Sequence, residues 1–163
     1  MIKFAATLLL VLTPSFASAH DIVRHNLPNN STFPIAAAVE VPAGATTVYL
    51  SGMVPPVADA AAPANTPAAY GDTQAQTVSV LNAIDAQLKG LGLTMGDVVK
   101  MQVFLVGDPA MDGRMDFGGF MKGYSQFFGT DAQPRLPVRS TMQVAALANP
   151  GFLVEIEVTA VRP

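Results

Sequence analysis

Residues 96–107, GDVVKMQVFLVG, limit the possible folds of this chain because they form a long and nearly continuous apolar run. A strand with one face in water would alternate between apolar and polar side chains along its length. A run that is apolar on both sides is typical of a strand with both faces covered. This segment therefore predicts a strand that is buried on both faces or lies at the centre of a sheet.

Two other segments have the periodicity of helices. Residues 72–88 repeat apolar side chains at spacings of three and four, and the glycines at 90 and 92 predict the end of this helix. The predicted apolar stripe consists of Val78, Leu81, Ile84 and Leu88. Residues 115–128 carry aromatic side chains largely on one side, which is typical of a helix that faces a core rather than a cofactor. Both helices should therefore pack on the sheet that contains the central strand.

Four further segments have the composition of strands, namely 35–41, 47–54, 138–147 and 152–161. The last two are separated by ANPG, which predicts that they form a hairpin. The segment between 55 and 71 is rich in Pro and Ala and is expected to be a long surface loop. The resulting fold class is α+β, a mixed β-sheet with two helices packed on one face. The other face must be polar or must pack against another subunit.

The first 19 residues have the features of a cleavable signal peptide. Lys3 precedes an apolar run too short to span a bilayer, and the small residues ASA at 17–19 suit a signal peptidase. Cleavage after Ala19 would leave residues 20–163 as a single domain that is periplasmic or secreted, with no membrane attachment. The chain has no cysteine, which excludes a lipid-anchored start, disulfides and a cysteine nucleophile. A net charge of −3 makes nucleic acid an improbable partner.

Arg139, in the stretch LPVRSTMQVAAL, is a permanent cation with no acidic residue nearby in the sequence. Strand alternation predicts that it shares the helix-free face of the sheet with a second set of polar side chains. These are Thr141, Gln143, Glu155 and Glu157. In the predicted hairpin the two glutamates are about 10–16 Å from Arg139 along the strand, too far for a direct pair. Arg139 is then either solvated at the rim of the sheet or binds an anion in a cleft completed by a neighbouring subunit.

Five motifs in the second half of the chain resemble the Rid family, the reactive intermediate deaminases, also called YjgF-like proteins. The motifs are GDTQAQTVSVLNAIDAQL (71–88), GDVVKMQVFL (96–105), YSQFF (124–128), PVRSTMQVAAL (137–147) and VEIEVTAV (154–161). LSGMVP (50–55) is a weaker match. Together these motifs extend over most of residues 47–163, and the combination of PVRST with VEIE is the most specific part.

The resemblance implies a chorismate-mutase-like fold and a homotrimer with clefts between subunits. It also implies the activity of the 2-iminobutanoate/2-iminopropanoate deaminases, which hydrolyse enamine and imine intermediates to 2-keto acids and ammonia. By this resemblance Arg139 and Glu155 would be catalytic, Arg139 holding the substrate carboxylate and Glu155 orienting water from across the interface. Gly52 and Thr141 would contact the substrate through their backbone. The implied partners are a small imino or keto acid and further copies of the chain, with no metal or organic cofactor.

Some positions depart from the family pattern and make the expected pocket more apolar. Ile35 stands at a position that is aromatic or hydroxylated in relatives, Met53 replaces a usual glutamine, and Met121 stands where asparagine is frequent. Ile35 and Met121 are expected to line the substrate site. These departures favour an alternative function, a non-catalytic trimer that binds small carboxylates in its inter-subunit cleft. In a third interpretation the chain is an interaction protein whose contact surface is the 55–71 loop.

Overall fold

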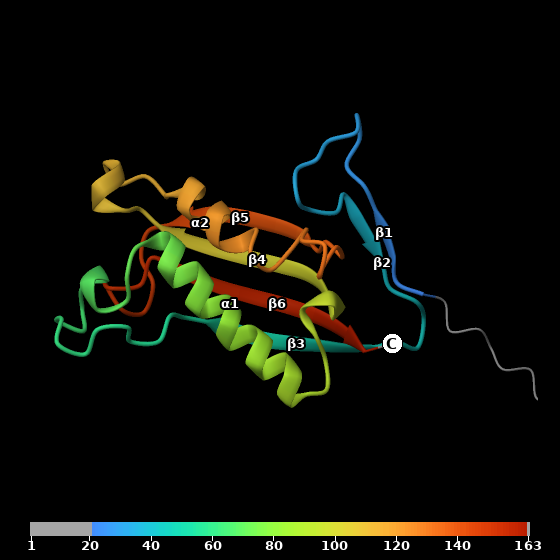
Figure 1. Cartoon of the computed structure of the whole chain (residues 1–163), viewed down its shortest axis with the longest axis horizontal. Coiled ribbons are helices and arrows are strands. Elements are labelled where there is room, and N and C mark those ends of the chain that lie inside the picture. Colours follow the sequence, from blue (N-terminus) through green and yellow to red (C-terminus); the bar gives the residue numbers. More distant parts are fainter. Residues whose placement is uncertain (1–20, 163) are drawn as a thin grey trace, which may run out of the picture.

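The computed structural model describes residues 21–162, and the predicted signal peptide lies outside the described residues. Its centre is a four-stranded mixed sheet with the order β3-β6-β4-β5. The strands are β3 (Thr46–Met53), β4 (Val98–Val106), β5 (Val138–Val144) and β6 (Val154–Arg162). Helices α1 (Thr73–Gly90) and α2 (Phe117–Tyr124) lie together on one face of this sheet (Figure 1). The predicted α+β class and the single helical layer are confirmed.

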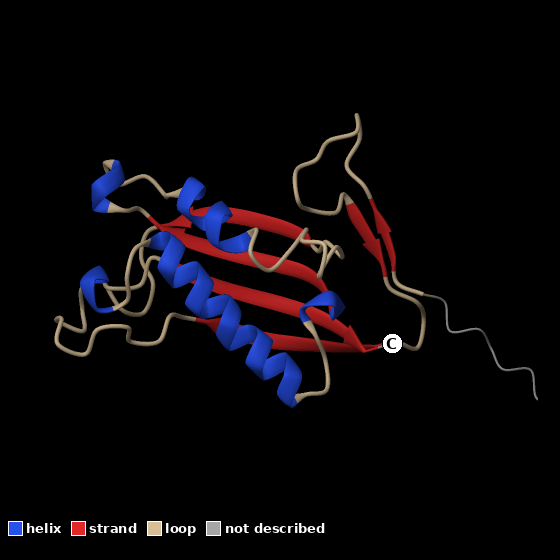
Figure 2. Cartoon of the chain, viewed as in Figure 1, coloured by secondary structure: helices blue, strands red, loops and turns tan. Residues whose placement is uncertain are grey.

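Strand β4 is the apolar run that the sequence placed inside a sheet, and it lies between β6 and β5. Met101, Val103 and Leu105 point into the core and are fully buried. Their neighbours on β6 are Val158, Ile156 and Val154, which are also buried. Figure 2 shows the two helices crossing in front of the strands that carry these side chains. The main core therefore forms between the helices and this face of the sheet.

The predicted hairpin between the last two strands is wrong. Strand β5 pairs in parallel with β4, and β6 lies on the other side of β4, antiparallel to both β4 and β3. The ANPG sequence does form a turn, in which Gly151 donates to the Asn149 side chain at 2.7 Å. A turn fixes only the local chain direction, whereas the connection through α2 returns the chain beside β4 as a parallel strand. The partner of β5 is thus determined by the crossover helix and not by the turn.

Helix α1 begins at Asp72, whose carboxylate accepts a hydrogen bond from the backbone N–H of Ala75 at 2.8 Å. Its buried face is rotated from the predicted stripe: Val80 joins Leu81, Ile84 and Leu88, while Val78 is only half-buried.

Helix α2 is shorter than the predicted 115–128 because it begins only after Asp116 and ends at Tyr124, with Phe127 and Phe128 in the following turn. A Cβ added to Gly123 would lie 2.7 Å from the Thr77 Cβ, so glycine there permits the close contact of α2 with α1.

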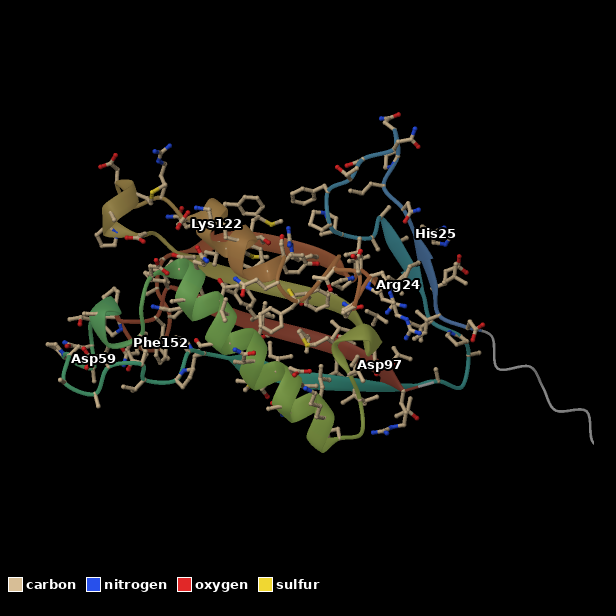
Figure 3. The ribbon with its side chains drawn as sticks, in the orientation of Figure 1. Arg24, His25, Asp59, Asp97, Lys122 and Phe152 are labelled. Atoms are coloured by element: carbon tan, nitrogen blue, oxygen red, sulfur yellow. The ribbon has the colours of Figure 1, made fainter. Side chains whose placement is uncertain are left out.

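The N-terminal segment differs from the sequence prediction. The predicted strand 35–41 is reduced to β2 (Ala38–Glu40), which pairs with an unpredicted β1 (Val23–His25) in a separate two-stranded sheet. This ribbon stands beyond the end of the main sheet (Figure 1). Arg24 fastens it to the domain by donating to the carbonyls of Leu136, Gly96 and Val98 at 3.1, 2.9 and 3.2 Å. Figure 3 shows Arg24 reaching from the ribbon towards the turn that contains Asp97.

The 55–71 loop lies at the opposite end of the sheet from this ribbon (Figure 1). Tyr70 is buried and its hydroxyl donates to the Ala64 carbonyl at 2.8 Å. The fully buried Gln76 of α1 joins the loop to the turn before β6 through three hydrogen bonds of 2.7–3.0 Å, to Gly71, Gly151 and Leu153. The loop is therefore packed against that turn.

Among residues 21–162, no helix is long and apolar enough to cross a membrane.

Candidate functional site

Arg139 lies on the helix-covered face of the sheet, and the predicted placement on the open face is wrong. In the parallel register Arg139 is the neighbour of Met101 and Thr141 is the neighbour of Val103, and both neighbours are core residues. Neighbouring residues on adjacent strands point to the same side of a sheet, so Arg139 and Thr141 point towards α2. The prediction failed because it assigned the polar side chains of this strand to the open face, whereas Arg139 and Thr141 are on the same side as the core residues of β4.

The Arg139 guanidinium is enclosed by aromatic rings. Its central carbon lies 4.3 Å from the ring centre of Tyr124 and 4.9 Å from that of Phe120. Phe33 and Phe117 are farther away, at 5.4 and 6.0 Å. All four distances are within the range of cation–π attraction. We call these four residues the aromatic box.

A thioether completes the surroundings of the guanidinium. The Arg139 Nη2 group donates to the Met121 sulfur at 3.3 Å. Met121 therefore lies at Arg139, as the sequence suggested, although its contact with substrate stays a prediction.

Two polar atoms in the site are buried and lack a hydrogen-bond partner. Within the part of the chain that the structure describes there are three such side-chain atoms, and two of them are Arg139 Nη1 and Thr141 Oγ1. Arg139 and Thr141 are two residues apart on one strand and point the same way, which places them about 7 Å apart. Buried polar groups almost always have partners, so two orphans in one place indicate that a polar ligand belongs there.

The electrostatic environment of Arg139 also indicates that an anionic ligand would be stabilised there. Burial lowers its pKa, and the nearby Tyr124 acts in the opposite direction. Burial also raises the pKa of Tyr124 to about 12, so its hydroxyl stays neutral and donates to the Pro34 carbonyl at 2.9 Å. Among residues 21–162 the ion pairs are His25 with Glu40 and Lys89 with Asp85. The desolvated cation thus has no carboxylate partner in this part of the chain, and an anion would supply one.

Gly52 and Glu155 form a separate pair on the opposite face of the sheet. Glu155 alternates with the core residues Val154 and Ile156, and its strand neighbour on β4 is Phe104. A Cβ on Gly52 would collide with the Glu155 carboxylate, so glycine at this bulge of β3 leaves the space that the carboxylate occupies.

Within one chain Arg139 and Glu155 cannot reach the same substrate. Arg139 is level with Met101, whereas Glu155 is level with Phe104, which is about 10 Å farther along the strands. Glu155 is also two strands away from Arg139, adding about 10 Å across the sheet, and it projects from the other face. The residues expected in one site are thus divided into Arg139, Thr141 and Met121 on one face and Gly52 with Glu155 on the other.

The sequence prediction missed Phe33, which contacts Arg139 from the N-terminal segment. Ile35, the predicted contact from this segment, is half-buried and its backbone N–H donates to the Phe33 carbonyl at 2.8 Å. Phe33 is the only Phe, Tyr or Trp between positions 20 and 48, and it directly precedes Pro34. This isolated aromatic residue was the sequence signal that could have identified Phe33, because an aromatic side chain in a polar segment usually packs against other residues.

Among residues 21–162, no group of His, Cys, Asp or Glu side chains could hold a metal ion.

Comparison with known proteins identifies the class to which this fold and site belong. The sequence profile of the family described as Endoribonuclease L-PSP matches residues 43–162. The chain belongs to this family, which is also the YjgF/Rid family. The match spans both helices and all four strands of the main sheet but not the β1–β2 ribbon.

Individual relatives agree with this assignment. The chain is 36% identical over 91 residues to TdcF of Escherichia coli, which is named a reactive intermediate deaminase; the alignment spans 56% of this chain and 64% of TdcF. A crystal structure of E. coli TdcF with bound serine is 32% identical, with a TM-score of 0.55 over 76% of this chain and 85% of the other. The Rid-family protein YyfB of Yersinia pestis shares the fold, with a TM-score of 0.62, 24% identity and coverage of 85% of this chain and 98% of the other.

Proposed function

We propose that this protein hydrolyses 2-imino acids, and the enamines in equilibrium with them, to 2-keto acids and ammonia. The observation that carries the proposal is the desolvated Arg139, whose Nη1 atom is buried without a partner beside the orphan Thr141 hydroxyl. A carboxylate that accepts from both groups would satisfy both orphans. Binding of the carboxylate in this way would hold the adjacent C=N carbon in a fixed position next to Arg139 and Thr141 of β5.

The chemistry needs little more than positioning and one proton relay. Water adds to the electrophilic imine carbon, giving a carbinolamine after its proton is lost. Protonation of the nitrogen and loss of the carbinolamine hydroxyl proton then allow the C–N bond to break, which releases ammonia and forms the carbonyl of the keto acid. A glutamate can accept the proton from water and return it to the leaving nitrogen. Glu155 is the candidate for this role.

Because Glu155 and Arg139 of one chain lie on opposite faces, the proposal requires a second copy that brings its Glu155 to Arg139. The helix-free face suits a contact between copies, since it carries Tyr49, which is 79% exposed. We propose a homotrimer, as the family resemblance implies. Light scattering of the purified mature protein tests this, and a monomer at the concentrations of the activity assay would contradict the shared site.

The runner-up function is a trimer that binds small carboxylates without turning them over. It is favoured by the immediate surroundings of Arg139, which include aromatic rings and the Met121 thioether, and by the absence of a carboxylate partner for Arg139 among residues 21–162. Such a protein would still bind a keto acid at Arg139, but it would not accelerate imine hydrolysis.

A single assay separates the two functions. An amino-acid oxidase generates the imino acid in a buffer of low nucleophilicity, and semicarbazide traps the imine that survives. We expect the wild type to shorten the lifetime of the imine and Arg139→Met to abolish the effect. Glu155→Gln should bind keto acid normally but lose turnover. Keto-acid binding without any acceleration by the wild type would reject the deaminase and support the binder.

A further inference from the structure

The aromatic side chains that cover Arg139 come from helix α2 and from the N-terminal segment, and the two groups differ in how deeply they are buried. Phe120 and Tyr124 are fully buried, and Phe117 packs against the same core cluster. Phe33 comes from the N-terminal segment, is 40% exposed and is not part of that cluster. Its ring lies nearly parallel to that of Phe117, with the centres 6.5 Å apart and 16° between the planes.

A ligand cannot reach the orphan atoms unless part of this cover moves. Arg139 Nη1 and Thr141 Oγ1 are both shielded from solvent, so the carboxylate must displace a neighbouring side chain. Phe120, Tyr124 and Phe117 are held by the core, which leaves Phe33 as the aromatic side chain that can swing out at least cost.

The backbone next to Phe33 is fixed and can act as a pivot. The Pro34 carbonyl accepts a hydrogen bond from the Tyr124 hydroxyl at 2.9 Å. The Ala36 N–H donates to the Pro137 carbonyl at 3.0 Å, two residues before Arg139. The segment that follows Phe33 therefore stays on the domain while the Phe33 side chain rotates.

We infer that Phe33 is a placeholder for the substrate side chain and that the site selects 2-imino and 2-keto acids with aromatic or bulky apolar side chains. When Phe33 leaves, the guanidinium loses one cation–π contact and Phe117 loses its parallel neighbour. A phenyl group on the substrate restores both contacts and a branched aliphatic group restores the packing against Phe117, whereas a methyl group leaves the vacated space unfilled. This inference rests on the proposed carboxylate site at Arg139.

The size of the preference follows from the group that is buried. Removing a phenyl side chain from water favours binding by about tenfold to a hundredfold over a methyl group. We therefore expect phenylpyruvate to bind at least tenfold more tightly than pyruvate when both are titrated calorimetrically into the full mature protein.

Variants of Phe33 and Phe117 distinguish whether the Phe33 ring is displaced by the ligand or is a side chain against which the ligand packs. In Phe33→Ala both acids should bind more tightly, because no ring has to be displaced, and their ratio should persist. In Phe117→Ala the ratio should fall towards one. The matched control is Phe152→Ala, a phenylalanine at the far end of the domain that packs edge-to-face on Tyr70 (Figure 3). It should leave both affinities unchanged, and urea unfolding of each variant confirms that it is folded.

Three results would overturn the inference. Equal affinity of the wild type for the two acids would remove the side-chain preference. Selective weakening of phenylpyruvate by Phe33→Ala would make Phe33 a wall that the ligand packs against. Failure of both acids to bind wild type and Phe33→Ala would remove the carboxylate site itself.

The imine assay keeps this inference distinct from the proposed function. Equal affinities together with hydrolysis of the alanine-derived imine would reject the preference and leave the deaminase standing. A tenfold preference for phenylpyruvate without hydrolysis of any imine would support the preference and reject the deaminase.

Discussion

Replacing Arg139 with methionine tests whether the buried cation serves a ligand or the fold. Methionine has a similar reach, is flexible and packs well against aromatic rings, so the box can close around it. The change removes the unpartnered Nη1, whose burial costs about 1–3 kcal/mol. It also removes cation–π attraction to the four rings, worth about 0.5–2 kcal/mol. The two effects largely cancel, and we expect the stability of the variant to lie between about 1 kcal/mol below and about 2.5 kcal/mol above that of wild type.

The assay is thermal and urea unfolding of both proteins, with and without a keto acid. In the absence of ligand the melting temperature should fall by no more than about 4 °C and can rise by up to about 10 °C, given about 2–4 °C per kcal/mol for a domain of this size. A keto acid at a hundredfold its dissociation constant should stabilise wild type by about 2.7 kcal/mol and the variant not at all. The control is Arg114→Met, which alters an exposed arginine and should leave the ligand effect intact. Destabilisation of Arg139→Met by more than about 3 kcal/mol would mean that the guanidinium holds the aromatic box together, and the ligand argument would fail.

Three further predictions concern other contacts in the domain, and a fourth concerns the predicted signal peptide. Gly52→Ala should lower the free energy of unfolding by about 1–3 kcal/mol through the clash with Glu155, and by much less in a Glu155→Ala background; additive effects in this double-mutant cycle would contradict the clash. Gln76→Leu should cost about 3 kcal/mol in urea unfolding, since it removes three buried hydrogen bonds, and an unchanged midpoint would refute this. Burial raises the pKa of Tyr124 to about 12, so the stability that its neutral form contributes is complete below pH 10 and is lost as the pH rises from 10 to 12. The free energy of unfolding of Tyr124→Phe should therefore fall less steeply over this pH range than that of wild type, and identical pH profiles would contradict the shift. Finally, N-terminal sequencing of the exported protein should begin at His20, and recovery of residues 1–19 on that protein would refute cleavage.

The sequence predicted those parts of the fold that depend on local pattern. The buried strand β4, the bounds of β3 to within one residue and the start of α1 at Asp72 were predicted from apolarity, β-branching and helical periodicity. The partner of β5 did not follow, because Val138–Val144 has the same composition whether it returns as a hairpin or pairs in parallel after α2. Pairing is decided by which edge of β4 is free when the chain arrives, and no short window of sequence contains that information.

The candidate site was predictable in identity but not in arrangement. Arg139 stands out as an isolated cation within a specific motif, whereas the close approach of Gly52 to the Glu155 carboxylate was not predicted. The face on which Arg139 lies was predicted from the alternation of polar and apolar residues, and it is reversed because the polar side chains of β5 point towards α2. Phe33 was missed because its contact is with a residue more than one hundred positions later, in a segment without periodicity.

The arrangement at Arg139 would allow a weakly charged site to hold the carboxylate that we propose. The desolvation of the guanidinium takes place when the domain folds, so a ligand that arrives later does not have to strip water from a solvated arginine. The same burial reduces the effective dielectric constant around the ion pair that forms, which strengthens it relative to one at the rim of the sheet. The aromatic rings offset part of the cost of the empty state through cation–π contacts that are weaker than an ion pair and can be exchanged for one. A polar cage would instead satisfy Nη1 permanently and leave nothing for the ligand to supply. On this reasoning the apolar residues around Arg139, which at first suggest a lost active site, are what keep the cation available for a carboxylate.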